Sequence, residues 1–187
     1  MGDLSSVSGG IHPRHGSHRS GRDVDVIFYA TDDAGRATQG RGWLSYDRFG
    51  LARESHPPAG VRAGGLYNLD VARNWQFVRS LLTDREVEVQ WIFCSNGVKA
   101  QLLRHAALHE PDPDVLLRAS WILHQPSSGN PHADHFHIRV YCGPTQSALG
   151  CIDDGPRWAW LGDEAFKSPE AVDAADDAAL LEAMAPL

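Results

Sequence analysis

Residues 134–142 read DHFHIRVYC, a stretch in which polar and apolar side chains alternate. Alternation with a period of two is typical of a β-strand that buries one face only. His135 and His137 would share one face of this strand, and the apolar residues next to them would share the other. We therefore expect a sheet whose polar face carries histidines and whose apolar face packs on a core.

A second stretch has the same pattern. Residues 23–30 read DVDVIFYA and predict another strand, with Asp23 and Asp25 on one face. If the two strands are neighbours in one sheet, the Cβ atoms of Asp25 and His137 would lie about 5 Å apart, the usual cross-strand spacing. A carboxylate and an imidazole at this distance could share one metal ion.

The segments between these strands have helical periodicity. A helix is expected to begin at Asn68 or Asp70, either of which could cap it, and to run to about residue 82. The other expected elements are a strand at residues 87–94, a helix at residues 96–109 and a helix from Asp112 or Asp114 to residue 123. Strands and helices that do not alternate as regular βαβ units predict an α+β fold.

Length, charge and hydropathy limit the classes of protein. The 187 residues suit one domain, expected over residues 1–165, with an acidic, alanine-rich tail at residues 166–187 that is a weak helix or disordered. The net charge of −7 argues against a nucleic-acid-binding protein. No apolar run approaches the ~20 residues of a membrane span, and residues 1–10 do not resemble a signal peptide. The oligomeric state is not indicated by the sequence.

The three cysteines are Cys94, Cys142 and Cys151, and no CxxC pair is present. A structural zinc site built from cysteine is therefore not expected. Cys142 and Cys151 flank a short loop rich in glycine, proline and serine, which favours a disulfide over two free thiols in a reducing compartment. Cys94 lies in an apolar run and is expected to be buried.

Six of the ten histidines fall in two short clusters, and this pattern suggests a metal site. The clusters are His12, His15 and His18, and His132, His135 and His137. His18 precedes Asp25 by seven residues, with Gly21 between them to let the chain fold back. A set of His18, Asp25 and His137 would leave a fourth position for water, as in catalytic zinc sites. His135 would then act as general base or stabilise an oxyanion.

The alternative interpretation is that the clustered histidines are solvated loop residues. The motifs HExxH, GxSxG and the P-loop are absent, which argues against the commonest zinc peptidases, serine hydrolases and nucleotide-binding proteins. Among the scattered histidines, His124 is expected to be a structural hydrogen-bonding group. His105 and His109 are expected on a helix surface.

The stretch SHRSGRDVD at residues 17–25 resembles the SxHxxGxxxD motif of the LAS group of metallopeptidases, and residues 135–137 match its HxH motif. This group contains lysostaphin-type enzymes, D-Ala-D-Ala peptidases and the hedgehog fold. The longer forms, HGSHRSGRDVD at residues 15–25 and HADHFHIRVYC at residues 132–142, are most similar to the penicillin-insensitive murein endopeptidases. The resemblance covers roughly residues 10–160.

This resemblance implies a zinc enzyme that cuts D-Ala–diaminopimelate cross-links in peptidoglycan. It implies that His18, Asp25 and His137 bind zinc, that His135 is the catalytic histidine, and that His15 and His132 line the site. It also implies a small antiparallel sheet carrying the zinc site, with helices on the other face. The implied location is the periplasm or cell envelope, and the Cys142–Cys151 loop resembles one of the family's bridges.

Two alternatives stay open. One is a D-Ala-D-Ala carboxypeptidase or dipeptidase, which uses the same kind of site on a different bond. The other is a zinc-bearing binding module of the same fold that has lost catalysis, as in hedgehog. The presence of His135 beside His137 favours an enzyme over a binding module. Arg14, Arg19 or Arg22 would engage substrate carboxylates if they are not simply solvated.

Overall fold

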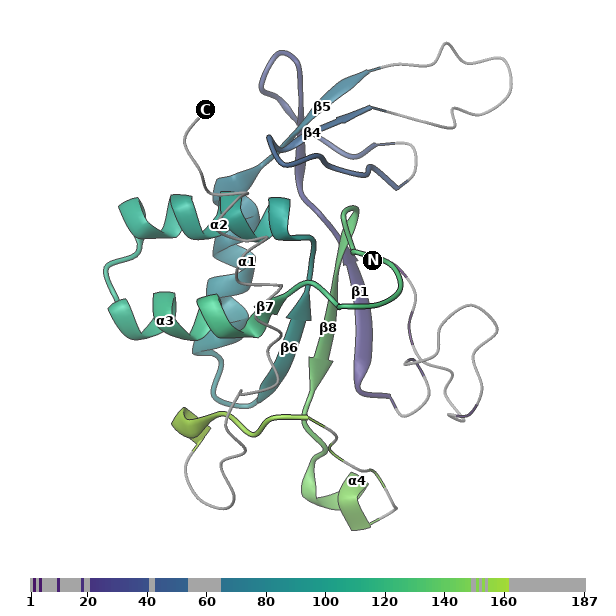
Figure 1. Ribbon diagram of the computed structural model, residues 1–187, viewed down its shortest axis with the longest axis vertical. Helices are drawn as coiled ribbons and strands as arrows, with labels where there is room; N and C mark the ends of the chain where they lie inside the picture. The colour runs from purple at the N-terminus through teal and green to yellow at the C-terminus, as the bar shows by residue number, and fades with distance from the viewer. Residues whose placement is uncertain are drawn as a thin grey trace.

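The computed structural model describes residues 2, 4, 10, 18, 21–40, 43–53, 65–148, 151, 153 and 155–161. These residues form two four-stranded sheets and four α-helices (Figure 1). The fold is therefore α+β, as the sequence predicts. None of the helices in this part of the chain has the length and apolar character needed to cross a membrane.

The larger sheet carries the stretches that the sequence singles out. Its strand order is β1 (Asp23–Ile27), β8 (His135–Val140), β6 (Val89–Phe93) and β7 (Leu123–His124). The register of β1 and β8 places Asp25 opposite His137, which confirms the expected pairing. The sheet is not wholly antiparallel, because β7 pairs with β6 in parallel. A parallel neighbour needs a long crossover, and two helices between β6 and β7 supply it.

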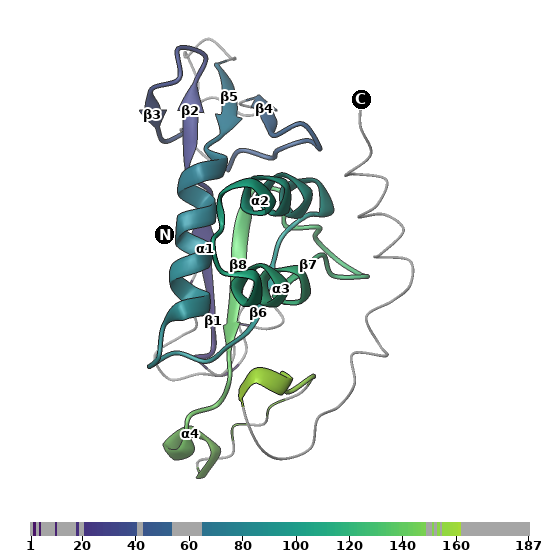
Figure 2. The same ribbon diagram turned by 90° about the vertical axis from the view of Figure 1, so that its left-hand side faces the viewer.

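Three helices lie together beside this sheet (Figures 1 and 2). They are α1 (Val71–Thr83), α2 (Asn96–His109) and α3 (Pro113–Ile122). The side chains of Asp70, Ser95 and Asp112 cap their first turns by accepting backbone N–H groups. The expected caps at Asp70 and Asp112 are confirmed, and α2 has the predicted bounds. Two further short helices are α4 (Pro144–Ala148) and the 3₁₀ turn η1 (Ala159–Leu161).

The apolar face of the sheet forms the core with these helices. Phe136 and Ile138 of β8 and Ile92 of β6 are at most 3% exposed, and they join Val78 of α1 and Leu102 of α2 in one cluster. The opposite face carries Asp25, His135 and His137. The alternation seen in the sequence therefore separates a core face from a polar face, as expected.

The second sheet was not predicted. It contains β3 (Ala37–Thr38), β2 (Ala30–Asp32), β5 (Leu66–Leu69) and β4 (Leu51–Arg53). The single strand expected at residues 23–30 is wrong, because β1 ends at Ile27 and β2 begins at Ala30 in the other sheet. Buried Asn74 of α1 accepts the backbone N–H of Tyr29 at 3.0 Å and donates to its carbonyl oxygen at 2.8 Å. Tyr29 therefore cannot continue the ladder, and the chain passes from one sheet to the other.

The disulfide between Cys142 and Cys151 is present, and Cys94 is a buried free thiol. Burial raises the pKa of Cys94 to about 12, so this thiol is neutral and packs as an apolar group. Within the disulfide loop region Asp153 accepts the backbone N–H of Cys142 at 2.9 Å and pairs with Arg22 at 2.7 Å. The loop is thereby tied to the residue that precedes β1.

Replacing Cys142 and Cys151 together by serine should lower the free energy of unfolding by about 2–3 kcal/mol, because a short closed loop would regain its entropy in the unfolded chain. Denaturant titration with and without reductant measures this. Reductant should lower the stability of the original protein and leave the double variant unchanged. Equal stability of the two proteins without reductant would contradict the expectation.

Candidate metal centre

Three side chains from two segments converge on the polar face of the sheet. Asp25 of β1 lies opposite His137 of β8, and His18 approaches from the chain before β1. Oδ1 of Asp25 is 3.3 Å from Nε2 of His18 and 3.4 Å from Nδ1 of His137. One ligand atom from each residue lies within 4.8 Å of the other two. Gly21, with φ of +78°, provides the left-handed turn between His18 and β1 that favours glycine.

The chemistry of this group suits a cation. His18 and Asp25 are fully buried and His137 is 5% exposed. Among the residues that the structure describes, neither carboxylate oxygen of Asp25 has a hydrogen-bond partner. A buried carboxylate without such partners is unfavourable unless a counter-charge or a metal ion satisfies it. The imidazoles hold the pKa of Asp25 below its usual value, although burial alone would raise it. These buried groups could therefore hold a metal ion.

A second carboxylate, that of Asp23, orients His137. Oδ1 of Asp23 is 2.8 Å from Nε2 of His137 and accepts a bond from Nε of Arg139 at 2.8 Å. Burial raises the pKa of Asp23, but His137 and Arg139 outweigh it and the net shift is downward. An ionised Asp23 fixes the proton of His137 on Nε2 and leaves Nδ1 to face Asp25. This is the arrangement in which metal-binding histidines are usually held.

We expect Asp23→Asn to weaken metal binding by about 10- to 100-fold, because the loss of its charge removes the group that orients His137. Isothermal titration with zinc measures the effect. Asp70→Asn is the matched control, since Asn caps a helix as well as Asp does. An affinity that is equal in both variants would show that Asp23 has no part in the site.

His135 lies beside this group rather than within it. Its Nδ1 is bonded to Oδ1 of Asp134 at 2.6 Å, and its Nε2 is 3.5 Å from Oδ1 of Asp25. The ring of Trp43 packs edge to face against the ring of His135, and the ring centroids are 4.8 Å apart. Burial lowers the pKa of His135, but the neighbouring carboxylates of Asp134 and Asp25 outweigh this and raise it to about 9. The ring is therefore fixed at one nitrogen and faces Asp25 with the other.

His132 lies on a further side of the metal group, next to His135 and His137. Its ring centroid is 5.0 Å from that of His135 and 5.3 Å from that of His137, and these three histidines form a second group whose ligand atoms are close. Burial and the two neighbouring histidines together lower the pKa of His132 to about 4. Its φ of +53° is unusual for a residue with a side chain. Two bonds hold this backbone, from the Ser95 N–H to its carbonyl oxygen and from its own N–H to Asn130 Oδ1.

The other candidate residues have separate outcomes. His15, His12, Arg14 and Arg19 lie outside the described residues. Arg22 is 7% exposed and its guanidinium pairs with Asp153 at 2.7 Å, so it is not simply solvated. His105 and His109 lie on α2 as expected, and His124 packs against Trp91 and Phe93. Sequence reasoning missed Asp134, although its position directly before His135 is a signal, and Trp43, for which no signal exists.

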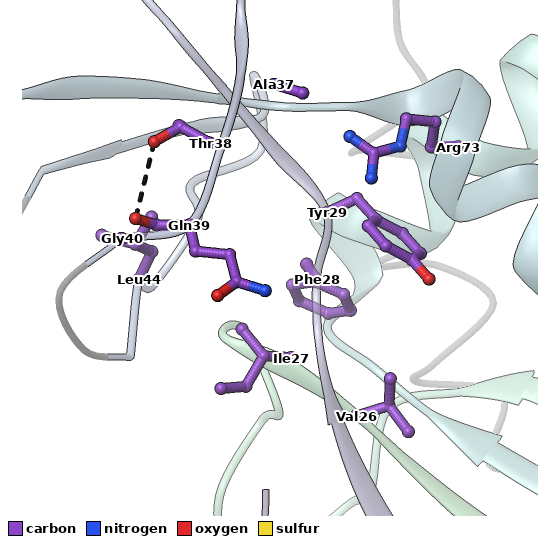
Figure 3. Close-up of a pocket in the computed structure, with 10 residues that line it drawn as sticks. All are labelled: Val26, Ile27, Phe28, Tyr29, Ala37, Thr38, Gln39, Gly40, Leu44 and Arg73. Carbon is purple, nitrogen blue, oxygen red and sulfur yellow. Dashed lines mark hydrogen bonds between the residues drawn. The ribbon is translucent and has the colours of Figure 1, made fainter. Parts of the chain in front are cut away.

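A cavity of about 580 Å³ opens at the carboxyl end of β1 (Figure 3). Ile27 lines it and follows Asp25 by two residues on the same face of β1. Residues two apart on a strand are about 7 Å apart. Neither the three metal-group residues nor His135 lines the cavity itself. Leu44 gives it an apolar side, and Gln39 and Arg73 give it polar ones. In Figure 3 the amide of Gln39 extends toward Phe28 and Ile27.

Comparison with protein-family models, curated proteins and solved structures finds no match for this chain.

Proposed function

We propose that this chain is a zinc-dependent murein endopeptidase that hydrolyses D-Ala–diaminopimelate cross-links between peptidoglycan stem peptides. The observation that carries the proposal is the convergence of His18, Asp25 and His137 on one buried point, with His135 beside them. The resemblance of residues 15–25 and 132–142 to murein endopeptidases supplies the substrate class. Two imidazoles and one carboxylate are a ligand set that suits zinc.

When bound, zinc supplies Lewis-acid polarisation of the scissile carbonyl and activates water for attack. His18, Asp25 and His137 would hold it, and Asp23 would keep the proton of His137 on Nε2. Asp134 keeps a proton on Nδ1 of His135 at 2.6 Å. Zinc held by Asp25 would neutralise part of the negative charge that raises the pKa of His135. Nε2 of His135 could then take the proton of the attacking water and deliver it to the leaving amine.

The arrangement around His135 favours an enzyme over a binding module. A zinc-bearing module needs the three ligands but no proton-transfer group beside them. Here Asp134 and Trp43 both fix the ring of His135, and Nε2 faces Asp25 at 3.5 Å. The disulfide is consistent with an oxidising compartment, so we propose the periplasm or cell envelope as the location.

One observation favours a second candidate, a D-Ala-D-Ala carboxypeptidase. Arg73 at the cavity is 45% exposed, and its cation could meet a terminal carboxylate. Its pairing with Asp70 at 3.5 Å weakens this candidate, because the guanidinium already has a counter-charge.

Product analysis separates the two candidates. Zinc-loaded protein is incubated with a cross-linked muropeptide dimer and, separately, with a monomer that ends in D-Ala-D-Ala. We expect the dimer to be converted to monomers and the D-Ala-D-Ala monomer to be unchanged. Release of free alanine from the monomer, with the dimer intact, would replace the endopeptidase by the carboxypeptidase.

A further inference from the structure

Two described residues, Gly2 and Leu4, pair with the outer edge of β1, and they are called the amino-terminal segment below. β1 is an edge strand, since its other side pairs with β8. Leu4 forms an antiparallel bridge with Val24, and the backbone N–H of Gly2 donates to the carbonyl oxygen of Asp25 at 2.8 Å. The segment therefore pairs with the strand that carries a metal ligand.

Gly2 lies at the metal group itself. A Cβ atom added to Gly2 would be 2.8 Å from Cβ of Asp25 and 2.8 Å from the ring of Trp43. Trp43 in turn contacts His135. The backbone of Gly2 thus fills the space between a metal ligand and the residue that packs on His135, where only glycine fits without displacement.

Backbone groups along this edge alternate in direction. The carbonyl of Arg22 accepts from Val140 of β8, so residues 22, 24 and 26 bond inward. Asp23, Asp25 and Ile27 then direct their N–H and C=O groups to the outer edge. A strand edge with outward N–H and C=O groups is a template for any extended peptide chain. Its Asp25 carbonyl already bonds to the N–H of Gly2.

We propose that the outer edge of β1 is the binding lane for one extended arm of the peptide substrate, and that the amino-terminal segment must leave it before substrate binds. This rests on the proposed function of the same site. A peptide running as Gly2 and Leu4 do, antiparallel to β1, passes Asp25 and continues past Ile27 into the cavity. The amino-terminal part of this arm then lies in the cavity.

Two variants test the segment: one should release it from the edge of β1, and the other should lock it there. Gly2→Pro removes the N–H that bonds Asp25 and adds atoms where none fit, so it releases the segment. Leu4→Cys combined with Val24→Cys places two thiols on paired residues, whose Cα spacing in antiparallel strands suits a disulfide. Oxidation locks the segment on the edge and reduction frees it. Leu4→Cys alone, treated with the same reagents, is the control for the native cysteines.

Two readouts are measured on zinc-loaded protein: kcat/KM for the cross-linked muropeptide dimer, and the rate of zinc loss to a chelator. Gly2→Pro should raise both about 10-fold, as expected if the segment occupies the edge about 90% of the time. In the oxidised double-cysteine variant, both kcat/KM and the rate of zinc loss should fall close to zero. Reduction should restore both. Equal kcat/KM in its oxidised and reduced forms would overturn the proposal.

The second readout keeps this proposal separate from the proposed function. If the original protein binds zinc but does not turn over the dimer, the endopeptidase assignment fails. The rates of zinc loss then test the segment without reference to hydrolysis. Equal rates in Gly2→Pro, in the oxidised double-cysteine variant and in the original protein would show that the segment does not cover the site, and would also overturn the proposal.

Discussion

His135→Ala should lower kcat for dimer hydrolysis by about 10²- to 10⁴-fold, the usual contribution of a general acid–base group. The reason is geometric. Nε2 of His135 faces Asp25 at 3.5 Å, and Asp134 holds its other nitrogen, so the ring is held in one orientation beside the metal group. Zinc should stay bound at one per chain, because His18, Asp25 and His137 are unchanged.

Discontinuous assays of dimer hydrolysis by zinc-loaded protein measure the fall in kcat. The zinc content of the same samples shows whether the metal stays bound. His109→Ala is the control, since His109 is exposed on α2 and belongs to neither histidine group. Unchanged turnover in His135→Ala would remove its assigned role. Loss of zinc from this variant would instead make His135 a ligand.

His18→Ala should lose zinc. His18 is fully buried and supplies one of the three converging ligand atoms, so its removal leaves only Asp25 and His137. Loss of a group that merely orients a ligand weakens a metal site by about 10- to 100-fold, and loss of a ligand should exceed this range. Hydrolysis should fall with occupancy.

Zinc titration of His18→Ala and of His109→Ala, followed by dimer hydrolysis at saturating zinc, provides the measurement. Full occupancy of His18→Ala at the zinc concentration that saturates the control would refute His18 as a ligand. His18→Ala leaves a small buried cavity, which could destabilise the protein. Thermal unfolding of both variants checks that each remains folded.

The elements that carry the site could be predicted because their signals are local. Alternation along β8 and along the first half of residues 23–30 gave the two faces, and the cross-strand spacing brought Asp25 to His137, as the register confirms. The apolar stripe of residues 96–109 predicted a helix with these bounds, and α2 has them.

What could not be predicted depends on residues far apart in the chain. β1 ends at Ile27 because Asn74, 45 residues after Tyr29, takes the Tyr29 backbone out of the ladder. The second sheet joins strands of two to four residues, which are too short to show periodicity. The contacts of Gly2 with Asp25 and of Trp43 with His135 likewise join segments with no shared pattern.

The central claim is that the group of His18, Asp25 and His137 holds zinc for the hydrolysis of peptidoglycan cross-links. Incubation of zinc-loaded protein with purified cross-linked muropeptide dimer, without chelator, with chelator, and with chelator followed by excess zinc, tests it most directly by mass spectrometry. The account predicts conversion to monomers that chelator abolishes and zinc restores. An intact dimer in the presence of protein that carries one zinc per chain would contradict it.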